Sequence, residues 1–225
     1  FLGKTYTYGE IAGLVDHAAA GLQKLGVKKG SRVGLFLPNC PQFVICFFAA
    51  LKAGATVISY SPLYAEDEIR NQINDSGTEI MITLDLKVLY PKIAKMVGTT
   101  TLRQLVVGTM QEVLPFPKSL LFPLVKRGDI AKTSGNHETS FADLLANDGN
   151  PTPVDLDPAD LAVLQYTGGT TGVPKGAMLS HANLYANAHQ AVMWLEGVEM
   201  GKERMMGVLP FFHIFALSVV MNLAL

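Results

Sequence analysis

The sequence predicts an α/β fold in which a mostly parallel sheet is flanked by helices, and three observations support this prediction. Short continuous apolar runs, each the length of a buried strand, alternate along residues 1–107 with longer stretches that carry apolar residues at helical spacing. Such alternation is typical of parallel βαβ units with right-handed crossovers. Hydrophobic residues make up 49% of the chain and charged residues 16%, which indicates a globular protein with a large core and excludes a disordered one.

The first helix has the clearest boundaries. Thr7 and Glu10 form a capping-box pair at its start, and Gly26 closes it. Between them, apolar residues recur at helical spacing: Ile11, Leu14, Val15, Ala18, Leu22 and Leu25. The elements predicted after this helix are, in order, a strand at 33–37, a helix at 41–53 that ends at Gly54, a strand at 56–59, a helix at 66–75, a strand at 79–83, a helix at 85–96 and a strand at 105–107.

Residues 108–153 interrupt this alternation. Pro115, Pro117 and Pro123 break an apolar stretch, and a polar stretch at 132–139 follows. One interpretation is a basic and apolar surface for membrane contact, built from Lys118, Leu120, Leu121, Phe122, Lys126 and Arg127. Because the apolar stretch is short, we favour a long connecting loop with locally buried leucines. The Asn-Pro-Thr-Pro sequence at 150–153 then predicts a rigid spacer that leads into a buried strand at 161–164.

Residues 205–225 carry no formally charged side chain, and His213 is their one titratable group. Their length fits a membrane-spanning helix, which needs roughly 20 apolar residues. Gly207, Pro210, His213 and Asn222 argue against that interpretation, and residues 205–209 are short enough for a buried strand. We therefore favour a strand, a turn at Pro210 and a buried helix.

The run at 166–176, Tyr-Thr-Gly-Gly-Thr-Thr-Gly-Val-Pro-Lys-Gly, carries most of the functional information. It follows the strand predicted at 161–164, and Ser180 begins a helical pattern after it. Glycines let a backbone approach a ligand closely, threonine hydroxyls add donors, and a lysine adds a mobile positive charge. A polyphosphate suits such a loop. The Walker A pattern is excluded because two residues separate Gly172 from Lys175, and a plain Gly/Thr-rich turn is the weaker alternative.

The sequence from Gln165 to Leu184 closely resembles the phosphate-binding motif of the adenylate-forming enzymes, a superfamily of acyl-CoA synthetases, luciferases and peptide-synthetase adenylation domains. Many members carry serine in place of Gly169. The Thr-Gly-Gly-Thr-Thr-Gly form, with Gly-Ala-Met-Leu after it, is most similar to bacterial long-chain fatty acid–CoA ligases. Further segments that resemble the family lie at 5–10, 32–41, 51–55, 61–64 and 209–215. The resemblance covers nearly the whole chain and is weakest at 98–150.

The resemblance implies ATP-dependent activation of a fatty acid to acyl-AMP, followed by transfer to coenzyme A, with Mg²⁺ as the metal. Thr170 and Thr171 are expected to donate to the phosphate oxygens, and Lys175 to supply charge that follows the departing pyrophosphate. Thr167 is the expected Mg²⁺ ligand. Glycines complete the predicted nucleotide-binding set at Gly168, Gly169, Gly172 and Gly176.

His213 is the third residue expected to be catalytic, beside Lys175 and Thr170. In the family, the matching histidine lies near the acyl pocket and the adenylate. Because a carboxylate is already ionised at neutral pH, we expect His213 to position the substrate rather than accept a proton. The structural alternative is a core histidine with one satisfied nitrogen. For His181 we expect a capping or surface role at the start of its helix.

The resemblance also bears on the extent of the chain. Residues 1–225 are expected to be part of a large N-terminal domain, with a later glutamate segment, a ribose-binding aspartate and a small C-terminal domain following residue 225. Such a fragment is expected to be inactive alone. The alternatives are an aryl- or medium-chain acyl-CoA ligase or another adenylation domain, and a non-catalytic nucleotide- or lipid-binding module.

Composition limits the partners and the compartment. A net charge of −1 provides no basic surface for nucleic acid. The two cysteines, Cys40 and Cys46, indicate a reducing cytoplasm and do not have the spacing of a metal site. The expected partners are therefore a fatty acid, ATP and CoA; a homodimer and peripheral membrane contact stay open.

Overall fold

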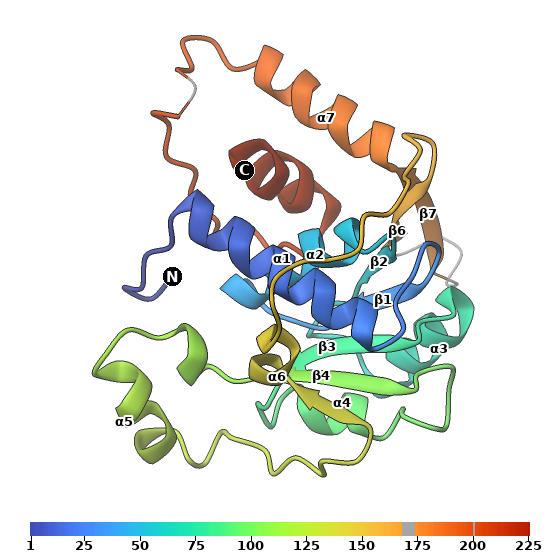
Figure 1. Cartoon of the computed structure of the whole chain (residues 1–225), viewed down its shortest axis with the longest axis vertical. Helices are drawn as coiled ribbons and strands as arrows, with labels where there is room; N and C mark the ends of the chain where they lie inside the picture. Colours follow the sequence, from blue (N-terminus) through green and yellow to red (C-terminus); the bar gives the residue numbers. More distant parts are fainter. Residues whose placement is uncertain (168–173, 200) are drawn as a thin grey trace.

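A computed structural model describes residues 1–167, 174–199 and 201–225. Its centre is a seven-stranded sheet with the strand order β5-β4-β3-β1-β2-β6-β7 (Figure 1). All neighbouring strands are parallel except β6 and β7, which are antiparallel. The strands are β1 (Arg32–Leu35), β2 (Thr56–Ser59), β3 (Ile80–Leu84), β4 (Gln104–Gly108), β5 (Glu138–Ser140), β6 (Leu161–Thr167) and β7 (Lys175–Ser180). The predicted α/β class is confirmed.

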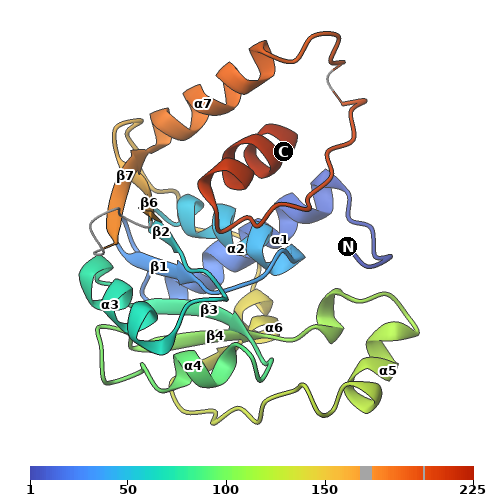
Figure 2. The same cartoon turned by 180° about the vertical axis from the view of Figure 1, so that it is seen from behind.

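Helices cover both faces of the sheet. Helices α1, α2 and α6 contact one another or the strands on one face, in front of the sheet in Figure 1. Helices α3 and α4 lie on the opposite face and come to the front in Figure 2. The helical segments are α1 (Tyr8–Lys24), α2 (Pro41–Lys52), α3 (Glu66–Ser76), α4 (Tyr90–Ala94), η1 (Gln111–Val113), α5 (Lys118–Val125), α6 (Phe141–Leu145), α7 (His181–Met193) and the π-helical η2 (Ala216–Asn222).

Local sequence signals account for the ends of α1. Thr7 Oγ1 accepts from the amide of Glu10 at 3.1 Å, and the Glu10 carboxylate accepts from the amide of Thr7 at 2.7 Å. This is the predicted capping box, which satisfies two amides that the helix itself leaves free. Past the end of the helix, Gly26 has φ +91°, a backbone conformation that favours glycine.

The central strands β2 and β3 are buried along their whole length, as the continuous apolar runs predict. Gly34 on β1 allows this close packing, because a Cβ there would lie 2.6 Å from Met81 Sδ and 2.9 Å from Tyr60 Cε2. The fully buried Tyr60 hydroxyl bonds to Thr78 Oγ1 at 2.6 Å and to Ser76 Oγ at 3.1 Å. Burial raises the pKa of Tyr60, and the two bonds satisfy its only polar group.

Two predictions for the middle of the chain are wrong. The helix predicted at 85–96 is limited to α4, because the backbone at its expected start bonds to a distant segment: Lys87 donates to the carbonyl of Asp129, and Ala131 to that of Asp85. The leucines expected to be buried in a connecting loop lie on α5, which buries none of its residues. Helix α5 contacts η1, and Lys118 at its start donates to the carbonyl of Leu2, but its outer apolar side chains Leu120, Leu124 and Val125 stay exposed.

The prediction for 205–225 is half right. A helix follows Pro210 and packs Leu217 and Met221 against the core. The strand expected at 205–209 is absent; this segment is irregular, and Met206 is 78% exposed. The carbonyls of Gly207 and Leu209 accept hydrogen bonds from the side-chain amide of Asn39, and not from a neighbouring strand. No helix within residues 1–167, 174–199 and 201–225 has the length and hydropathy needed to cross a bilayer.

Candidate functional site

A small cavity brings two of the predicted site residues together at the carboxyl end of the parallel strands. Its volume is about 170 Å³. Thr167 at the end of β6 and His213 after Pro210 both line it. Its other lining residues are Ser59, Ser61, Tyr64, Gln165, Tyr166, Phe212 and Ile214. In open α/β sheets, ligands bind at this end of the strands, so the location fits a binding site.

The loop predicted to bind phosphate connects two strands of a hairpin. Strands β6 and β7 pair antiparallel, and Thr167 lies opposite Lys175 at the base of the loop. The sequence predicted a strand, a loop and then a capped helix; β7 was missed, because none of its residues is buried and its apolar run at 177–179 is only three residues long. The helix does follow at α7, with Ser180 as its N-cap. Gly168, Gly169, Thr170, Thr171 and Gly172 lie outside the described residues.

Tyr166 fixes the base of this hairpin. Its side chain is 7% exposed, and its hydroxyl donates to the carboxylate of Asp75 at the end of α3. Burial, together with the hydrogen bond and the charge of Asp75, raises the pKa of Tyr166. Gly176 faces the ring: a Cβ there would lie 3.2 Å from Tyr166 Cζ. The glycine therefore has a packing reason, and its predicted role in nucleotide binding stays a prediction.

The side chain of His213 is exposed, so the alternative of a core histidine is wrong. Its backbone amide donates to the carbonyl of Pro210 at 3.0 Å, and its Nδ1 accepts from the amide of Phe215 at 3.4 Å. A neutral imidazole that accepts at Nδ1 carries its proton on Nε2. His213 can therefore offer an N–H to an anionic oxygen at the cavity, in agreement with a positioning role.

His181 has a different environment. Ser180, rather than His181, caps α7, so of the two roles expected for His181, capping or surface, the capping role is wrong. Its half-buried ring lines a cavity of about 220 Å³ with Lys29 and Asp160, which form an ion pair of 2.6 Å. Desolvation lowers the pKa of His181 against the opposing charge of Asp160. No group of acidic, cysteine and histidine side chains suited to a metal ion occurs among the described residues, so Thr167 stays the predicted Mg²⁺ ligand on sequence alone.

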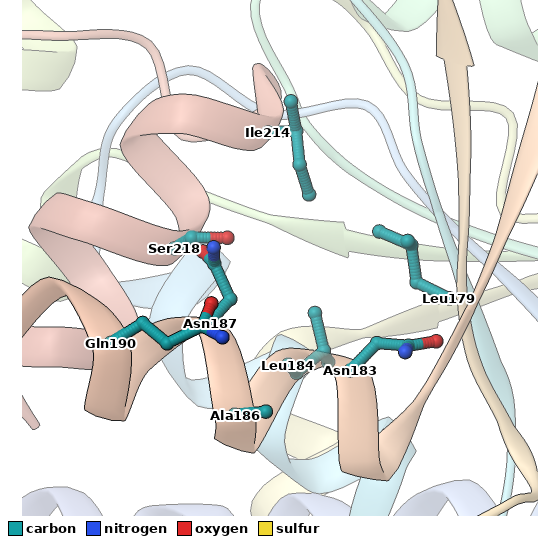
Figure 3. Close-up of a pocket in the computed structure, with 8 residues that line it drawn as sticks. All are labelled: Leu179, Asn183, Leu184, Ala186, Asn187, Gln190, Ile214 and Ser218. Atoms are coloured by element: carbon teal, nitrogen blue, oxygen red, sulfur yellow. The ribbon is translucent and has the colours of Figure 1, made fainter.

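A larger groove lies beside the first cavity, between α7 and the C-terminal helix (Figure 3). Its volume is about 460 Å³. Leu179, Leu184 and Ile214 give it an apolar side, and Asn183, Asn187 and Gln190 on α7 lie along it. Ile214 lines both the groove and the small cavity. The groove and the small cavity therefore lie on either side of Ile214.

Comparison with known proteins decides the family. The family model described as AMP-binding enzyme matches residues 1–225. This chain belongs to that family. The resemblance inferred from the sequence is therefore confirmed for the whole chain, including the segment at 98–150 where it was weakest.

Three relatives show how similar this chain is in sequence to known ligases. The chain is 42% identical over 229 residues to a long-chain-fatty-acid–CoA ligase of Bacillus subtilis, covering 99% of this chain and 40% of the relative. It is 36% identical over 225 residues to the ligase of the same name from Escherichia coli O157:H7, covering 97% of this chain and 40% of the relative. A 4-coumarate–CoA ligase from Oryza sativa is 33% identical over 231 residues, with 97% of this chain and 37% of the relative covered. The chain thus spans about 40% of the length of the first relatives.

Solved structures of other proteins have the same fold. A long-chain-fatty-acid–CoA ligase from Archaeoglobus fulgidus superposes with a TM-score of 0.75 at 24% identity, over 99% of this chain and 40% of that one. The apo structure of MatB from Rhodopseudomonas palustris gives a TM-score of 0.76 at 22% identity, over 98% and 38%. At these identities the likeness concerns the fold alone, and it confirms the predicted α/β architecture.

Sequence reasoning assigned no role to three residues of this site. Gln165 and Ser59 line the small cavity, and each has a buried oxygen without a hydrogen-bond partner among the described residues. Asn39 lies outside the cavity but bonds to the segment that precedes His213. Their positions in the sequence could have indicated a role: Ser59 and Gln165 lie near the carboxyl ends of β2 and β6, and Asn39 follows β1. Polar residues at that end of a parallel strand often belong to a site.

Proposed function

We propose that this chain is the N-terminal part of a long-chain fatty acid–CoA ligase. The enzyme would activate a fatty acid with ATP to acyl-AMP and then form acyl-CoA. The observation that supports this most is the 42% identity to a long-chain ligase, which extends over 99% of the chain. The shared cavity of Thr167 and His213 supports the same conclusion, because the two residues come from distant parts of the sequence.

The first reaction requires two anions to meet. A carboxylate oxygen of the fatty acid attacks the α-phosphorus of ATP, the bond to the bridging oxygen breaks, and pyrophosphate leaves with the electron pair. Positioning and charge stabilisation carry most of the catalysis in such reactions. Among the described residues, no carboxylate lines the small cavity, so these residues add little repulsion to the incoming anions. We assign charge stabilisation to Lys175 and hydrogen-bond donation to Thr170 and Thr171.

Mg²⁺ fits the donor set only in part. A threonine hydroxyl is the kind of oxygen ligand that Mg²⁺ accepts, and Thr167 is exposed at the end of β6. With no acidic cluster among the described residues, most other ligands would come from phosphate and water. Bound there, the ion would neutralise phosphate charge. In the second reaction the CoA thiolate attacks the acyl carbonyl, the bond between the acyl carbon and the phosphate oxygen breaks, and AMP leaves with the electron pair.

For the fatty acid we propose the apolar groove between α7 and the C-terminal helix. It adjoins the small cavity at Ile214, so a carboxylate beside His213 would direct its alkyl chain into the groove. Asn187 is exposed along this groove. Asn187→Phe in the complete ligase should raise KM for long fatty acids more than for medium ones, because the added ring fills the part of the groove that only a long alkyl chain would reach. Asn187→Ala is the control, and equal effects of Asn187→Phe on all chain lengths would remove the groove from the proposal.

A substrate panel tests the proposed activity against its alternatives. Pyrophosphate release by the complete ligase is measured with short, medium and long fatty acids, aryl acids and amino acids. The proposal expects the highest kcat/KM with long fatty acids. Preference for an aryl acid or an amino acid would identify another ligase or adenylation domain. Binding of ATP in a calorimeter without release for any acid would support the non-catalytic module instead.

We also propose that the ligase works in the cytoplasm and touches membranes through α5. Four apolar side chains form one exposed face of this helix: Leu120 (67% exposed), Leu121 (49%), Leu124 (74%) and Val125 (76%). Lys118, Lys126 and Arg127 flank that face, while residues 114–128 contain no acidic side chain. The whole chain has a net charge of −1, whereas residues 114–128 carry a net positive charge. Apolar side chains bordered by cations fit an anionic lipid surface.

Sedimentation with vesicles tests this contact. Wild-type ligase should pellet with mixed phosphatidylglycerol–phosphatidylcholine vesicles and less with pure phosphatidylcholine. Leu120→Ser with Leu124→Ser should lower binding to both, whereas Lys126→Glu with Arg127→Glu should lower only the anionic preference. Leu63→Ser is the control, since Leu63 is 87% exposed elsewhere. Wild-type ligase that pellets with neither vesicle would mean that another part of the protein covers α5.

A further inference from the structure

We infer that Asn39 and Gln165 are positioning residues that hold His213 in place for substrate; this rests on the proposed role of His213. Asn39 lies in the connection between β1 and α2. Its Nδ2 donates to the carbonyls of Gly207 at 3.1 Å and Leu209 at 2.8 Å, and its Oδ1 accepts from the amide of Phe211 at 2.8 Å. One amide thus satisfies three backbone groups of the segment that leads to His213.

Gln165 holds the other end of that segment. Its side chain is 6% exposed on β6, and its Nε2 donates to the carbonyl of Phe212 at 3.1 Å. Phe212 is the residue before His213, so the bond connects the end of the sheet to the histidine. The rings of Phe43 and Phe211 add an apolar contact, with centroids 5.8 Å apart. The segment is therefore attached to the connection between β1 and α2, to α2 itself and to β6.

These attachments matter because the segment has little structure of its own. Residues 203–208 are irregular, and Met206, Val208 and Leu209 are 78%, 71% and 46% exposed. Because so few apolar side chains are buried before Phe211, the side-chain amides of Asn39 and Gln165 hold this segment in position relative to the sheet. A displacement of about 1 Å in a positioning group can lower a rate about 100-fold. The two amides therefore control where the imidazole lies relative to the small cavity.

The identity of each amide is specific. Asn39 both donates and accepts, and the reverse orientation would place its NH₂ against the amide of Phe211. Aspartate at this position keeps the acceptor and puts a negative charge against two carbonyl oxygens. Methionine in place of Gln165 keeps the approximate volume and removes the donor to Phe212. Asn39→Asp and Gln165→Met are accordingly the informative variants.

Gln42 provides a matched control. It is also a buried glutamine, 0% exposed, whose Nε2 donates to a backbone carbonyl, that of Thr109, at 3.0 Å. Like Gln165, it has an Oε1 without a partner among the described residues. It does not line the small cavity. Gln42→Met therefore reproduces the loss of one buried amide bond without touching the segment before His213.

The experiment measures kcat and KM for fatty-acid-dependent pyrophosphate release by the complete ligase, together with Tm. Gln165→Met and Asn39→Asp should lower kcat/KM about 10- to 100-fold. Gln42→Met should lower Tm to a similar extent as Gln165→Met and change kcat/KM less than about 3-fold. Adding Gln165→Met to His213→Ala should cause little further loss, because a residue that acts through another is non-additive with it.

Two outcomes would overturn the inference. Equal losses of activity in Gln165→Met and Gln42→Met would assign Gln165 a general structural role. Full additivity of Gln165→Met with His213→Ala would show that it does not act through the histidine. The proposed function fails separately, through absence of fatty-acid-dependent pyrophosphate release in the wild type or through full activity of His213→Ala.

Discussion

Residues 15–107, which form most of the sheet, and residues 175–225 bury apolar side chains very differently. Between residues 15 and 107, large side chains such as Leu22, Phe36 and Phe47 are fully buried. Between residues 175 and 225, Met193, Trp194 and Met206 are 84%, 88% and 78% exposed. The first part contributes most of the core, whereas the second lines the groove beside the small cavity. We propose that substrate and the rest of the ligase cover the second part.

The largest expected effect comes from deleting one large apolar side chain in each part. Phe47→Ala should lower the free energy of unfolding by about 3–5 kcal/mol, because it opens a cavity at a fully buried site. Met193→Ala should change it by less than about 0.5 kcal/mol, because the side chain is 84% exposed. Urea denaturation of the 225-residue chain measures both. Equal losses would mean that the last part is packed as tightly as the sheet.

A smaller effect is expected at Tyr166, where the two parts meet. Tyr166→Phe removes the hydroxyl that donates to Asp75 and keeps the ring against Gly176. The expected loss of unfolding free energy is about 1 kcal/mol, the usual net value of one hydrogen bond. Tyr185→Phe, at a site 69% exposed, serves as the control. A loss of stability no greater than that of the control would show that the bond does not anchor the hairpin.

The smallest effect is a pH dependence at the start of α7. Desolvation lowers the pKa of His181 in the folded chain. The charge of Lys29 lowers this pKa further, and the charge of Asp160 opposes the shift. The unfolded state therefore binds more protons between the folded pKa and about 6.5, and stability rises with pH through that window. His181→Gln should flatten the rise in Tm on going from about pH 5 to pH 7. An unchanged slope would assign the pH dependence to another group.

The same contrast explains how much the sequence could predict. Thr7 with Glu10 and the continuous apolar runs predicted α1 and the central strands, because local pattern and burial agree there. The pattern could not place β7, because that strand has no buried residue and only a short apolar run. It could not place the segment at 205–209, because the conformation of that segment depends on a partner distant in sequence: Asn39 bonds to the carbonyls of 207 and 209.

The candidate site was predictable to a similar degree. The motif at 166–176 and the resemblance of 209–215 named Thr167 and His213 separately, and the structure brings them to one cavity. Gln165 was not found, since a glutamine in a strand has no local signal for a bond to Phe212, far along the chain. The leucines of α5 were expected to be buried because an apolar run does not reveal whether any neighbour covers it.

The central claim is that the loop at 166–176 binds the phosphates of ATP during acyl adenylation. The most direct test is fatty-acid-dependent ATP–pyrophosphate exchange by the complete ligase carrying Lys175→Ala or Thr170→Ala. Loss of one charge-stabilising or donor group should slow exchange at least about 100-fold. Lys202→Ala, at an exposed lysine paired with Glu199, should leave it unchanged. Wild-type exchange rates in both loop variants would contradict the account.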